Sequence, residues 1–163
     1  MEADYDVAIL GAGAGGLSAG LYTTRAMLKT IILEQLGPGG QLLITDEIEN
    51  YPGFPDCIKG QELSIRMEQQ TTKFGAEIEY TEVIGIDGIE LPIKTIHTDE
   101  RDFTAKAIII ATGGAHNKLG VSGEDALAGR GVSYCAVCDG NFFRGQDVVV
   151  VGGGDAALDE GHY

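Results

Sequence analysis

The sequence of 163 residues has little proline, few basic residues and no long apolar run. Four prolines, with 44% hydrophobic and 22% charged residues, exclude a disordered or fibrous chain and are typical of a globular protein. Eleven basic against twenty-five acidic residues give a net charge of −14, so we do not expect binding to nucleic acid. No apolar run reaches the roughly 18 residues of a membrane span, and the N-terminus, MEADYD, is acidic where a signal peptide is basic. We therefore expect a cytoplasmic protein that does not bind membranes.

Cysteine is also scarce, and its number limits what it can do. Three cysteines do not form the disulfide framework of a small secreted domain. Cys135 and Cys138 form a Cys-x-x-Cys motif followed at once by Asp139, and in a reducing compartment such a pair is catalytic or metal-binding. Cys57 stands alone, and we expect it to be a partly buried apolar side chain near a proline-rich turn.

Glycine, by contrast, is abundant. The twenty-five glycines gather in clusters at residues 11–16, 37–40, 113–114 and 152–154. Clusters of this kind indicate loops that a ligand approaches closely, because a residue without a side chain leaves room for it.

The first glycine cluster lies between a short apolar run, residues 5–10, and a helical pattern. Gly11, Gly13 and Gly16 satisfy G-x-G-x-x-G, in which the glycines allow the turn, the approach of a pyrophosphate and close helix packing. The phosphates would lie at the helix N-terminus. A second apolar run ends in Glu34, about twenty residues further on, where a carboxylate can bind a ribose. The N-terminal segment is therefore predicted to bind a dinucleotide.

The middle of the chain predicts further elements of an α/β fold. Residues 35–55 form a long loop rich in glycine and proline, and such loops are usually functional. We expect a helix over residues 61–74, ended by Gly75, and a small antiparallel meander over residues 77–106. His97 in this meander is expected to be a solvated strand residue rather than a metal ligand. The run AKAIIIATGG then predicts a fully buried strand of a parallel sheet.

After the Cys-x-x-Cys motif, the chain repeats its opening pattern. Residues 147–161, DVVVVGGGDAALDEG, predict a strand, a glycine turn and the start of a helix. Gly152, Gly154 and Ala157 fit the G-x-G-x-x-A form, so we expect a second dinucleotide site to begin here. Two such sites around one Cys-x-x-Cys suggest a path for electrons from one cofactor through another to a dithiol.

The residues around the cysteine pair favour redox chemistry over zinc binding. A Cys-x-x-Cys beside Asp139 offers a thiolate nucleophile, a resolving thiol and a carboxyl that can move a proton. A zinc clip needs four ligands, and the other candidates, Cys57, His116 and His162, form no paired motif. We therefore predict a redox pair and no metal site.

Five segments together resemble the N-terminal half of a low-molecular-weight bacterial or archaeal thioredoxin reductase: GAGAGG, GPGGQLLITDEIENYPGFP, ATGG, GRGVSYCAVCDG and VVGGGDAAL, in that order. The resemblance covers essentially the whole chain. It implies an α/β protein in which residues 1–114 are the N-terminal part of a Rossmann-type FAD-binding domain with a small antiparallel β-meander. Residues 115–163 would begin an inserted, Rossmann-type NADPH-binding domain that carries the redox pair.

The resemblance also assigns individual residues. The FAD ligands would lie on glycine turns, on the long loop and at strand ends: Gly11, Gly13, Ala14, Gly15, Glu34, Gln35, Gly40, Gln41, Thr45, Asn50, Val83, Ala111, Thr112 and Gly113. The NADPH phosphate loop would comprise Gly152, Gly153, Gly154, Asp155 and Ala156. Cys135 and Cys138 match the redox pair, and Asp139 matches its acid and base.

The function implied by this resemblance is transfer of reducing equivalents from NADPH, through FAD, to the Cys135–Cys138 disulfide and on to thioredoxin or a thioredoxin-like protein. The resemblance further implies a homodimer, with Cys138 facing the flavin and Cys135 attacking the substrate. A relative that takes electrons from ferredoxin, one that serves a peroxidase, and an incomplete FAD-binding fragment remain alternatives.

One departure from the family is large. Such reductases complete the flavin site after the inserted domain, whereas this sequence ends at DEGHY, inside that domain's first helix. The basic residues that select the 2′-phosphate of NADPH and the late Gly-Asp segment that holds the flavin ribityl chain do not occur in it. We expect either a fragment or a partner chain that supplies the second half. Ala14 replaces a proline common in the family, and we expect this change to matter little.

Overall fold

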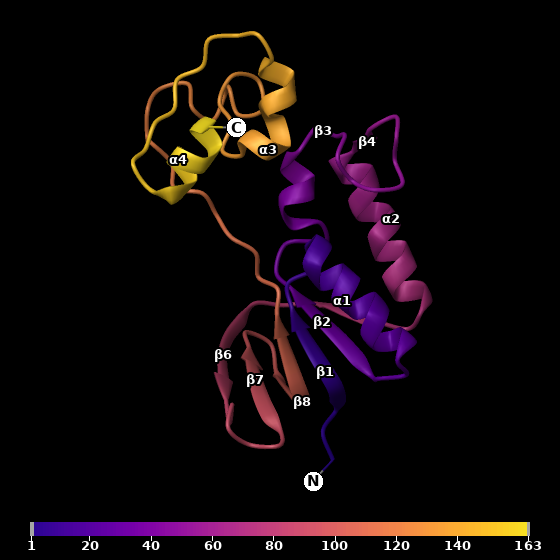
Figure 1. Ribbon diagram of the computed structural model, residues 1–163. Helices are drawn as coiled ribbons and strands as arrows, with labels where there is room; N and C mark the ends of the chain where they lie inside the picture. The colour runs from indigo at the N-terminus through magenta and orange to yellow at the C-terminus, as the bar shows by residue number, and fades with distance from the viewer. Residues whose placement is uncertain (1, 163) are drawn as a thin grey trace. The chain divides into compact units, whose positions relative to one another are not determined.

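The computed structural model describes residues 2–162, which form two compact units (Figure 1). The first unit comprises residues 2–47 and 58–114, and the second comprises residues 48–57 and 115–162. No helix among residues 2–162 combines the length and the apolar character needed to cross a membrane.

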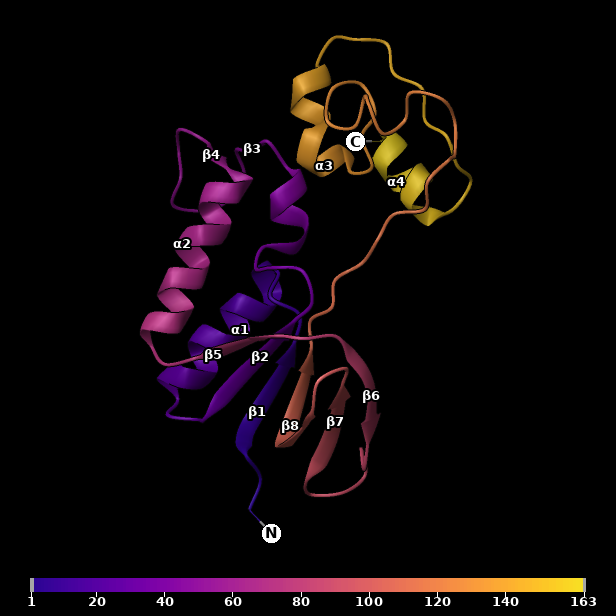
Figure 2. The same cartoon turned by 180° about the vertical axis from the view of Figure 1, so that it is seen from behind.

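The first unit is built on a six-stranded sheet of order β5-β2-β1-β8-β7-β6 (Figures 1 and 2). The strands are β1 (Tyr5–Leu10), β2 (Thr30–Glu34), β5 (Glu77–Tyr80), β6 (Val83–Asp87), β7 (Lys94–Thr98) and β8 (Asp102–Ile110). Strands β5, β2, β1 and β8 pair with one another in parallel. Strand β7 pairs antiparallel with β8, and β6 pairs antiparallel with β7. The predicted α/β class is confirmed in this unit.

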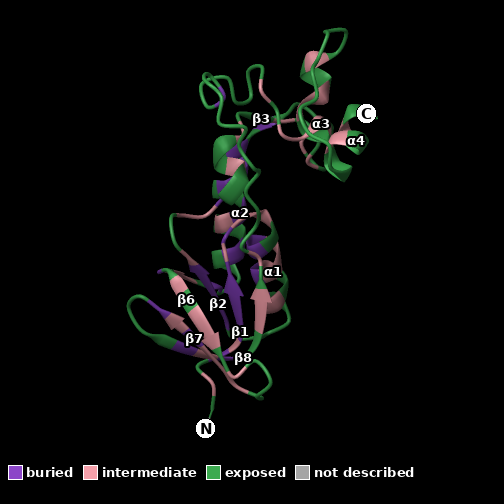
Figure 3. Cartoon of the chain, turned by 90° about the vertical axis from the view of Figure 1, so that its left-hand side faces the viewer, coloured by how far each residue is buried: buried purple, intermediate pink, exposed green. Residues whose placement is uncertain are grey.

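Two helices cover the centre of the sheet. Helix α1 (Ala14–Arg25) packs chiefly on β1 and β2, and α2 (Gly60–Lys73) packs along α1. A Cβ atom at Gly20 would lie 2.7 Å from Ile32 Cδ1, so glycine lets α1 approach the sheet. The buried Thr71 hydroxyl donates to the Leu17 carbonyl at 2.9 Å and so ties α2 to α1. Figure 3 shows the resulting core as the buried parts of β1, β2 and the helices.

Helix α2 agrees closely with expectation. The predicted helix over residues 61–74 is found one residue earlier, and Gly75 follows it with φ +98°. The long loop contains short elements: the 3-10 helix η1 (Gly40–Ile44) and a two-stranded ladder of β3 (Glu47–Ile48) and β4 (Ile58–Lys59).

The meander is smaller than predicted. Residues 77–80 form β5, which pairs in parallel with β2 rather than antiparallel with its successor, so the antiparallel part consists of β6, β7 and β8. The reason is the connection: β5 follows β2 through the crossover helix α2, and such a crossover returns the chain parallel. Alternating apolar residues indicate a strand but do not indicate its partner.

The prediction that the strand AKAIIIATGG is fully buried is wrong. Ala105 is buried, but Lys106 and Ala107 are exposed and Ile110 is 71% exposed. Strand β8 has hydrogen-bonded neighbours on both sides, β1 and β7, as a central strand should. Burial requires a layer over each face as well, and α1 lies chiefly over β1 and β2.

The second unit consists of short helices joined by loops. Its elements are α3 (Ala136–Asp139), the 3-10 helix η2 (Gly140–Phe143) and α4 (Asp155–His162). The predicted helix start after the last glycine cluster is therefore present. The strand predicted just before it is not: residues 147–151 are irregular and exposed. A strand needs a hydrogen-bonded neighbour, and this unit offers none to that segment within the described residues.

Cys57 also differs from expectation. It is exposed rather than partly buried, and its φ is +60°. The residue ends the 48–57 segment of the second unit, where Pro52, Gly53 and Pro55 keep the chain in surface turns.

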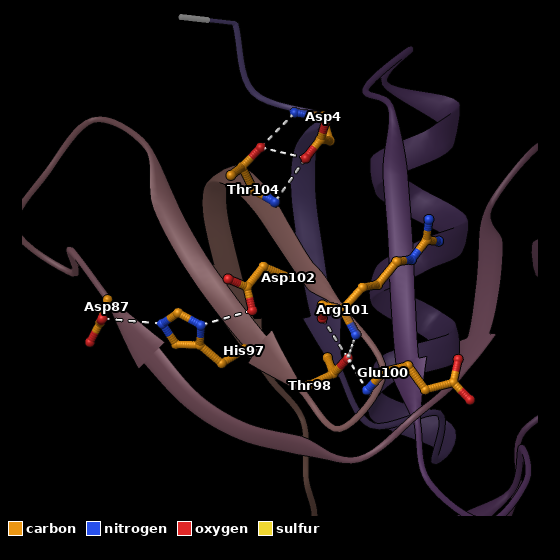
Figure 4. Close-up of polar contacts among 8 residues, drawn as sticks. All are labelled: Asp4, Asp87, His97, Thr98, Glu100, Arg101, Asp102 and Thr104. Carbon is orange, nitrogen blue, oxygen red and sulfur yellow. Dashed lines mark hydrogen bonds and ion pairs between the residues drawn. The ribbon is translucent and has the colours of Figure 1, made fainter.

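His97 lies on β7 as predicted, and its ring bridges two carboxylates from the neighbouring strands (Figure 4). Nδ1 lies 2.9 Å from Asp102 Oδ1, and Nε2 lies 3.1 Å from Asp87 Oδ2. The hydrogen bond to Asp102, then that to Asp87, raises the pKa of His97 above its usual value. The imidazole therefore links β6, β7 and β8 through side chains.

This bridge predicts a pH dependence of stability. Because the folded-state pKa is raised, the contribution of His97 is fully present below pH 6.5 and is lost as pH rises through the folded-state value. The free energy of urea unfolding of the wild type should exceed that of His97→Gln most in mildly acidic buffer, and the gap should narrow as pH rises. The double variant Asp87→Asn/Asp102→Asn should lack this trend. A gap that does not change with pH would contradict the bridge.

Candidate functional site

The glycine turn at the end of β1 has the geometry that its spacing predicts. Gly11 has φ +99°, and a Cβ atom there would lie 2.5 Å from the Ala111 carbonyl oxygen. A Cβ atom at Gly16 would overlap the Gly11 carbonyl oxygen. These two positions therefore accept only glycine, because the strand, the turn and the helix approach one another at backbone distance.

The other glycines of the turn face open space. Nothing lies within 4 Å of a Cβ atom at Gly15, and the nearest atom to one at Gly13 is Gly40 Cα, at 4.0 Å. Helix α1 starts with no side-chain capping bond and no acidic residue in its first turn. The first N–H groups of α1 can therefore donate hydrogen bonds to a bound anion, and the helix dipole favours a negative charge there. The turn fits a pyrophosphate.

Glu34, at the end of β2, lies beside this turn. Its Oε2 accepts the Ala12 N–H at 2.7 Å, and its Oε1 accepts the Leu36 N–H at 3.0 Å and the Gly37 N–H at 3.4 Å. The backbone thereby fixes the carboxylate at the edge of the sheet. Glu34 stays partly exposed, so it can still accept hydrogen bonds from ribose hydroxyls.

Three glycine clusters meet at this edge. The Gly39 N–H donates to the Ala12 carbonyl at 2.8 Å, which ties residues 37–40 to the first turn. The Ala111 N–H donates to the Leu10 carbonyl at 2.9 Å, so the turn after β8 begins beside the end of β1. Gln41 Nε2 donates to the Gly114 carbonyl at 3.0 Å. In parallel sheets, ligands bind outside the carboxyl ends of the strands, and this is that edge.

The remaining residues assigned to FAD are placed as follows. Ala14 is the first residue of α1, and Val83 is the first residue of β6. Thr45 Oγ1 donates to the Gln41 carbonyl at 2.9 Å. The exposed residues are Gln35 and Gly40, and, after β8, Thr112 and Gly113. Asn50 belongs to the second unit.

The predicted redox pair lies in the second unit and is a disulfide. Cys135 and Cys138 are bonded, with their Cα atoms 5.3 Å apart. Cys135 caps the N-terminus of α3, and its Sγ accepts the Cys138 N–H at 3.2 Å. Cys138 is exposed, whereas Cys135 is half-buried. A disulfide in which one cysteine is exposed can be approached by an external thiol.

Asp139 is held next to the pair by a serine that sequence reasoning missed. The Ser133 hydroxyl donates to Asp139 Oδ2 at 2.6 Å, and Ser133 Oγ accepts the Cys135 N–H at 3.2 Å. Ser133 therefore joins the two ends of the segment from residue 133 to residue 139. The Ser-x-Cys spacing was the available signal, since serine hydroxyls commonly bond to backbone groups two residues away.

Two further carboxylates support this segment and were also missed. Glu160 Oε2, on α4, accepts the Ala136 N–H at 2.8 Å. Glu124 accepts the hydroxyl of Tyr134, the residue before Cys135, at 2.7 Å. Neither could be singled out in a chain with twenty-five acidic residues, because the partners are far apart in the sequence.

Glu124 is buried and stays charged. The Tyr134 hydroxyl, then the backbone N–H groups around it, lower the pKa of Glu124 to about 2. The same hydrogen bond raises the pKa of Tyr134 to about 12. One contact is the largest cause of both shifts, because it favours a carboxylate beside a neutral phenol.

The last glycine cluster forms the predicted turn into a helix. Gly152 has φ +148°, and a Cβ atom there would lie 3.1 Å from Ala157 Cβ. Nothing lies within 4 Å of a Cβ atom at Gly153 or Gly154. Asp155 and Ala156 then open α4. Between residues 2 and 162, no group of three His, Cys, Asp or Glu side chains could hold a metal ion.

Comparison with known proteins identifies the family of the chain. The family model of the pyridine nucleotide-disulphide oxidoreductases matches residues 5–163. The chain is 53% identical over 163 residues to the thioredoxin reductase of Listeria innocua, covering 99% of this chain and 50% of that protein. It is 51% identical to the thioredoxin reductase of Bacillus subtilis, with 99% and 51% covered.

A solved structure gives the same result. The crystal structure of thioredoxin reductase from Streptococcus pyogenes matches with a TM-score of 0.89 and 48% identity, covering 96% of this chain and 50% of that one. The chain thus spans about half the length of the curated relatives that it matches.

The buried carboxylate predicts an acid dependence of stability in the second unit. Because the folded-state pKa of Glu124 is lowered, its contribution is present above pH 4.5 and is lost as pH falls from 4.5 toward about 2. The difference in free energy of urea unfolding between wild type and Glu124→Gln should therefore shrink as pH falls through this range. Tyr134→Phe removes the main cause of the shift and should weaken the trend. An undiminished difference in acid would show that Glu124 is not ionised in the folded state.

Proposed function

The chain belongs to the pyridine nucleotide-disulphide oxidoreductase family, and we propose that it carries the FAD site and the redox disulfide of a thioredoxin reductase. The observation that carries this proposal is the Cys135–Cys138 disulfide beside Asp139. Similarity to thioredoxin reductases over 99% of the chain supports it.

Residues 1–114 are proposed to form the N-terminal part of the FAD-binding domain. The open glycine turn and the start of α1 would hold the pyrophosphate, and Glu34 would hold a ribose. Gln41 and the turn at residues 111–113 would line the rest of the cofactor in the first unit. Bound FAD would supply a two-electron carrier.

Residues 115–163 are proposed to begin the NADPH-binding domain. The turn from Gly152 to Ala156 would approach the phosphates of the nucleotide, since its last two glycines face open space. We further propose that the complete protein works in the cytoplasm as a homodimer and passes its electrons to thioredoxin or a thioredoxin-like protein.

The pair and Asp139 carry the groups that disulfide exchange needs, and the two electrons would come from the proposed NADPH. Reduction of the Cys135–Cys138 disulfide takes up two electrons and two protons and gives two thiols. The Cys135 thiolate then attacks the disulfide of the protein substrate and forms a mixed disulfide, releasing one substrate thiolate. Cys138 attacks Cys135 Sγ, which restores the internal disulfide and releases the second. Asp139, held by Ser133, would carry protons to and from these sulfurs.

The flavin proposal predicts the effect of a side chain at Gly13. Gly13→Val should fold, because the nearest protein atom to its Cβ would be 4.0 Å away, but it should lose FAD because that Cβ occupies the phosphate site. Heat-released cofactor, identified by chromatography, measures the loss. Gly16→Val is the contrast: its side chain overlaps the Gly11 carbonyl, so it should fail to fold. FMN released by the wild type, or FAD retained by Gly13→Val, would contradict the site.

The disulfide proposal predicts which variant traps a substrate. The chain is reduced, desalted and mixed with oxidised thioredoxin. The wild type and Cys57→Ser should each reduce one thioredoxin disulfide per chain, since only Cys135 and Cys138 are bonded to each other. In the Cys57→Ser background, Cys138→Ser should accumulate a mixed disulfide with thioredoxin, detected by mass, because no thiol remains to resolve it. Cys135→Ser should form none. The opposite pattern would reverse the two roles, and no transfer by the wild type would refute the proposed function.

A further inference from the structure

Glu124 is the only charged residue buried within residues 2–162, at 5% exposed. Its Oε1 accepts the Leu119 N–H at 2.8 Å and the Tyr134 hydroxyl at 2.7 Å, and its Oε2 accepts the Gly120 N–H at 2.6 Å. A buried carboxylate is costly unless it is hydrogen-bonded in this way. Two of the three donors are backbone groups near it in sequence, so they fix the carboxylate independently of Tyr134.

The loop between Glu124 and Tyr134 is itself held closed. The Leu127 N–H donates to the Gly123 carbonyl at 3.0 Å, and the Leu127 carbonyl accepts the Val132 N–H at 2.9 Å. Gly129 N–H donates to the Val132 carbonyl at 2.9 Å. The loop therefore brings Tyr134, the residue before Cys135, back to the Glu124 carboxylate.

Tyr134 is held on two sides. Its hydroxyl is bonded to Glu124, and its ring stacks on His116 with centroids 3.5 Å apart and planes 17° apart. Cys135 follows directly, so no intervening residue can absorb a movement of Tyr134. Cys135 in turn caps α3, the turn in which the disulfide closes.

We propose that Glu124 is a positioning residue for the redox pair: through Tyr134 it holds the backbone that enters Cys135, and so favours the disulfide over the dithiol. The inference rests on the proposed redox function of Cys135 and Cys138. The physical reason is proximity. A thiol pair held at bonding distance closes more readily than one whose backbone moves, because less freedom is lost on bond formation. Glu124 does not touch the sulfurs and takes no part in the exchange itself.

A double-mutant cycle on the thiol–disulfide equilibrium tests this. The full chain, with Cys57→Ser to remove the third thiol, is equilibrated in glutathione redox buffers, and the fraction of the pair in the disulfide form is measured by alkylation and mass. Glu124→Gln and Tyr134→Phe should each lower the equilibrium constant for disulfide formation by roughly two- to fivefold, the scale of one hydrogen bond. The double variant should show no more than the larger single effect, because Glu124→Gln weakens the same contact that Tyr134→Phe removes.

The neighbouring carboxylate supplies a matched control. Asp125 has a side chain 79% exposed and pairs with Lys118 at 2.6 Å, so Asp125→Asn removes the same charge one residue away without touching Tyr134. It should leave the equilibrium constant unchanged. If Asp125→Asn changed the equilibrium constant as much as Glu124→Gln does, the effect would come from the loss of a negative charge alone. That result would overturn the proposal.

Other outcomes also decide the matter. An unchanged constant in folded Tyr134→Phe, or additive effects in the double variant, would overturn the positioning role. If Glu124→Gln fails to fold by circular dichroism, Tyr134→Phe decides alone, since it keeps the ring that stacks on His116. A wild-type pair that does not cycle in the buffers would refute the proposed function itself. A cycling wild type with unresponsive variants would refute only the role of Glu124.

Discussion

The first unit depends on one constraint, the approach of three backbone segments at the carboxyl end of β1. Gly11 lies against the Ala111 carbonyl, and Gly16 lies against the Gly11 carbonyl, both closer than any side chain permits. These contacts fix the angle at which α1 leaves the sheet, and Gly20 then lets the helix lie on Ile32 of β2. Core packing and an open turn at the start of α1 thus come from the same short run of glycines.

The long loop after β2 is folded onto this turn rather than left free. Gly39 bonds to Ala12, and the Pro38 carbonyl accepts the Ser64 hydroxyl of α2 at 2.8 Å. A Cβ atom at Gly60 would overlap the Leu42 carbonyl, so α2 begins against η1. The loop therefore links the second helix to the glycine turn, which explains why a segment so poor in regular structure keeps a defined path.

The sequence predicts these features well where they are local and poorly where they depend on a distant partner. The spacing of Gly11, Gly13 and Gly16 specifies the turn, because strand, turn and helix are consecutive in the chain. The pairing of β5 with β2, the exposure of Ile110 and the irregular path of residues 147–151 depend on which other element lies alongside. Glu124 was missed for the same reason, since its role is visible only when Tyr134 is known as its partner, whereas Ser133 could have been found from its spacing to Cys135.

The cysteine pair lies in an acidic setting, and this decides how its thiolate can be stabilised. Asp139, Glu160 and Glu124 all accept hydrogen bonds from the segment that carries it, and nearby carboxylates oppose a further negative charge. The donor that reaches Cys135 Sγ is instead the backbone N–H of Cys138. The direction of this N–H group is set by the backbone of α3, and no mobile cationic side chain is involved in the contact. Reactivity at Cys135 should therefore depend on how firmly that turn is held, so residues that fix the backbone matter as much as those that contact the sulfur.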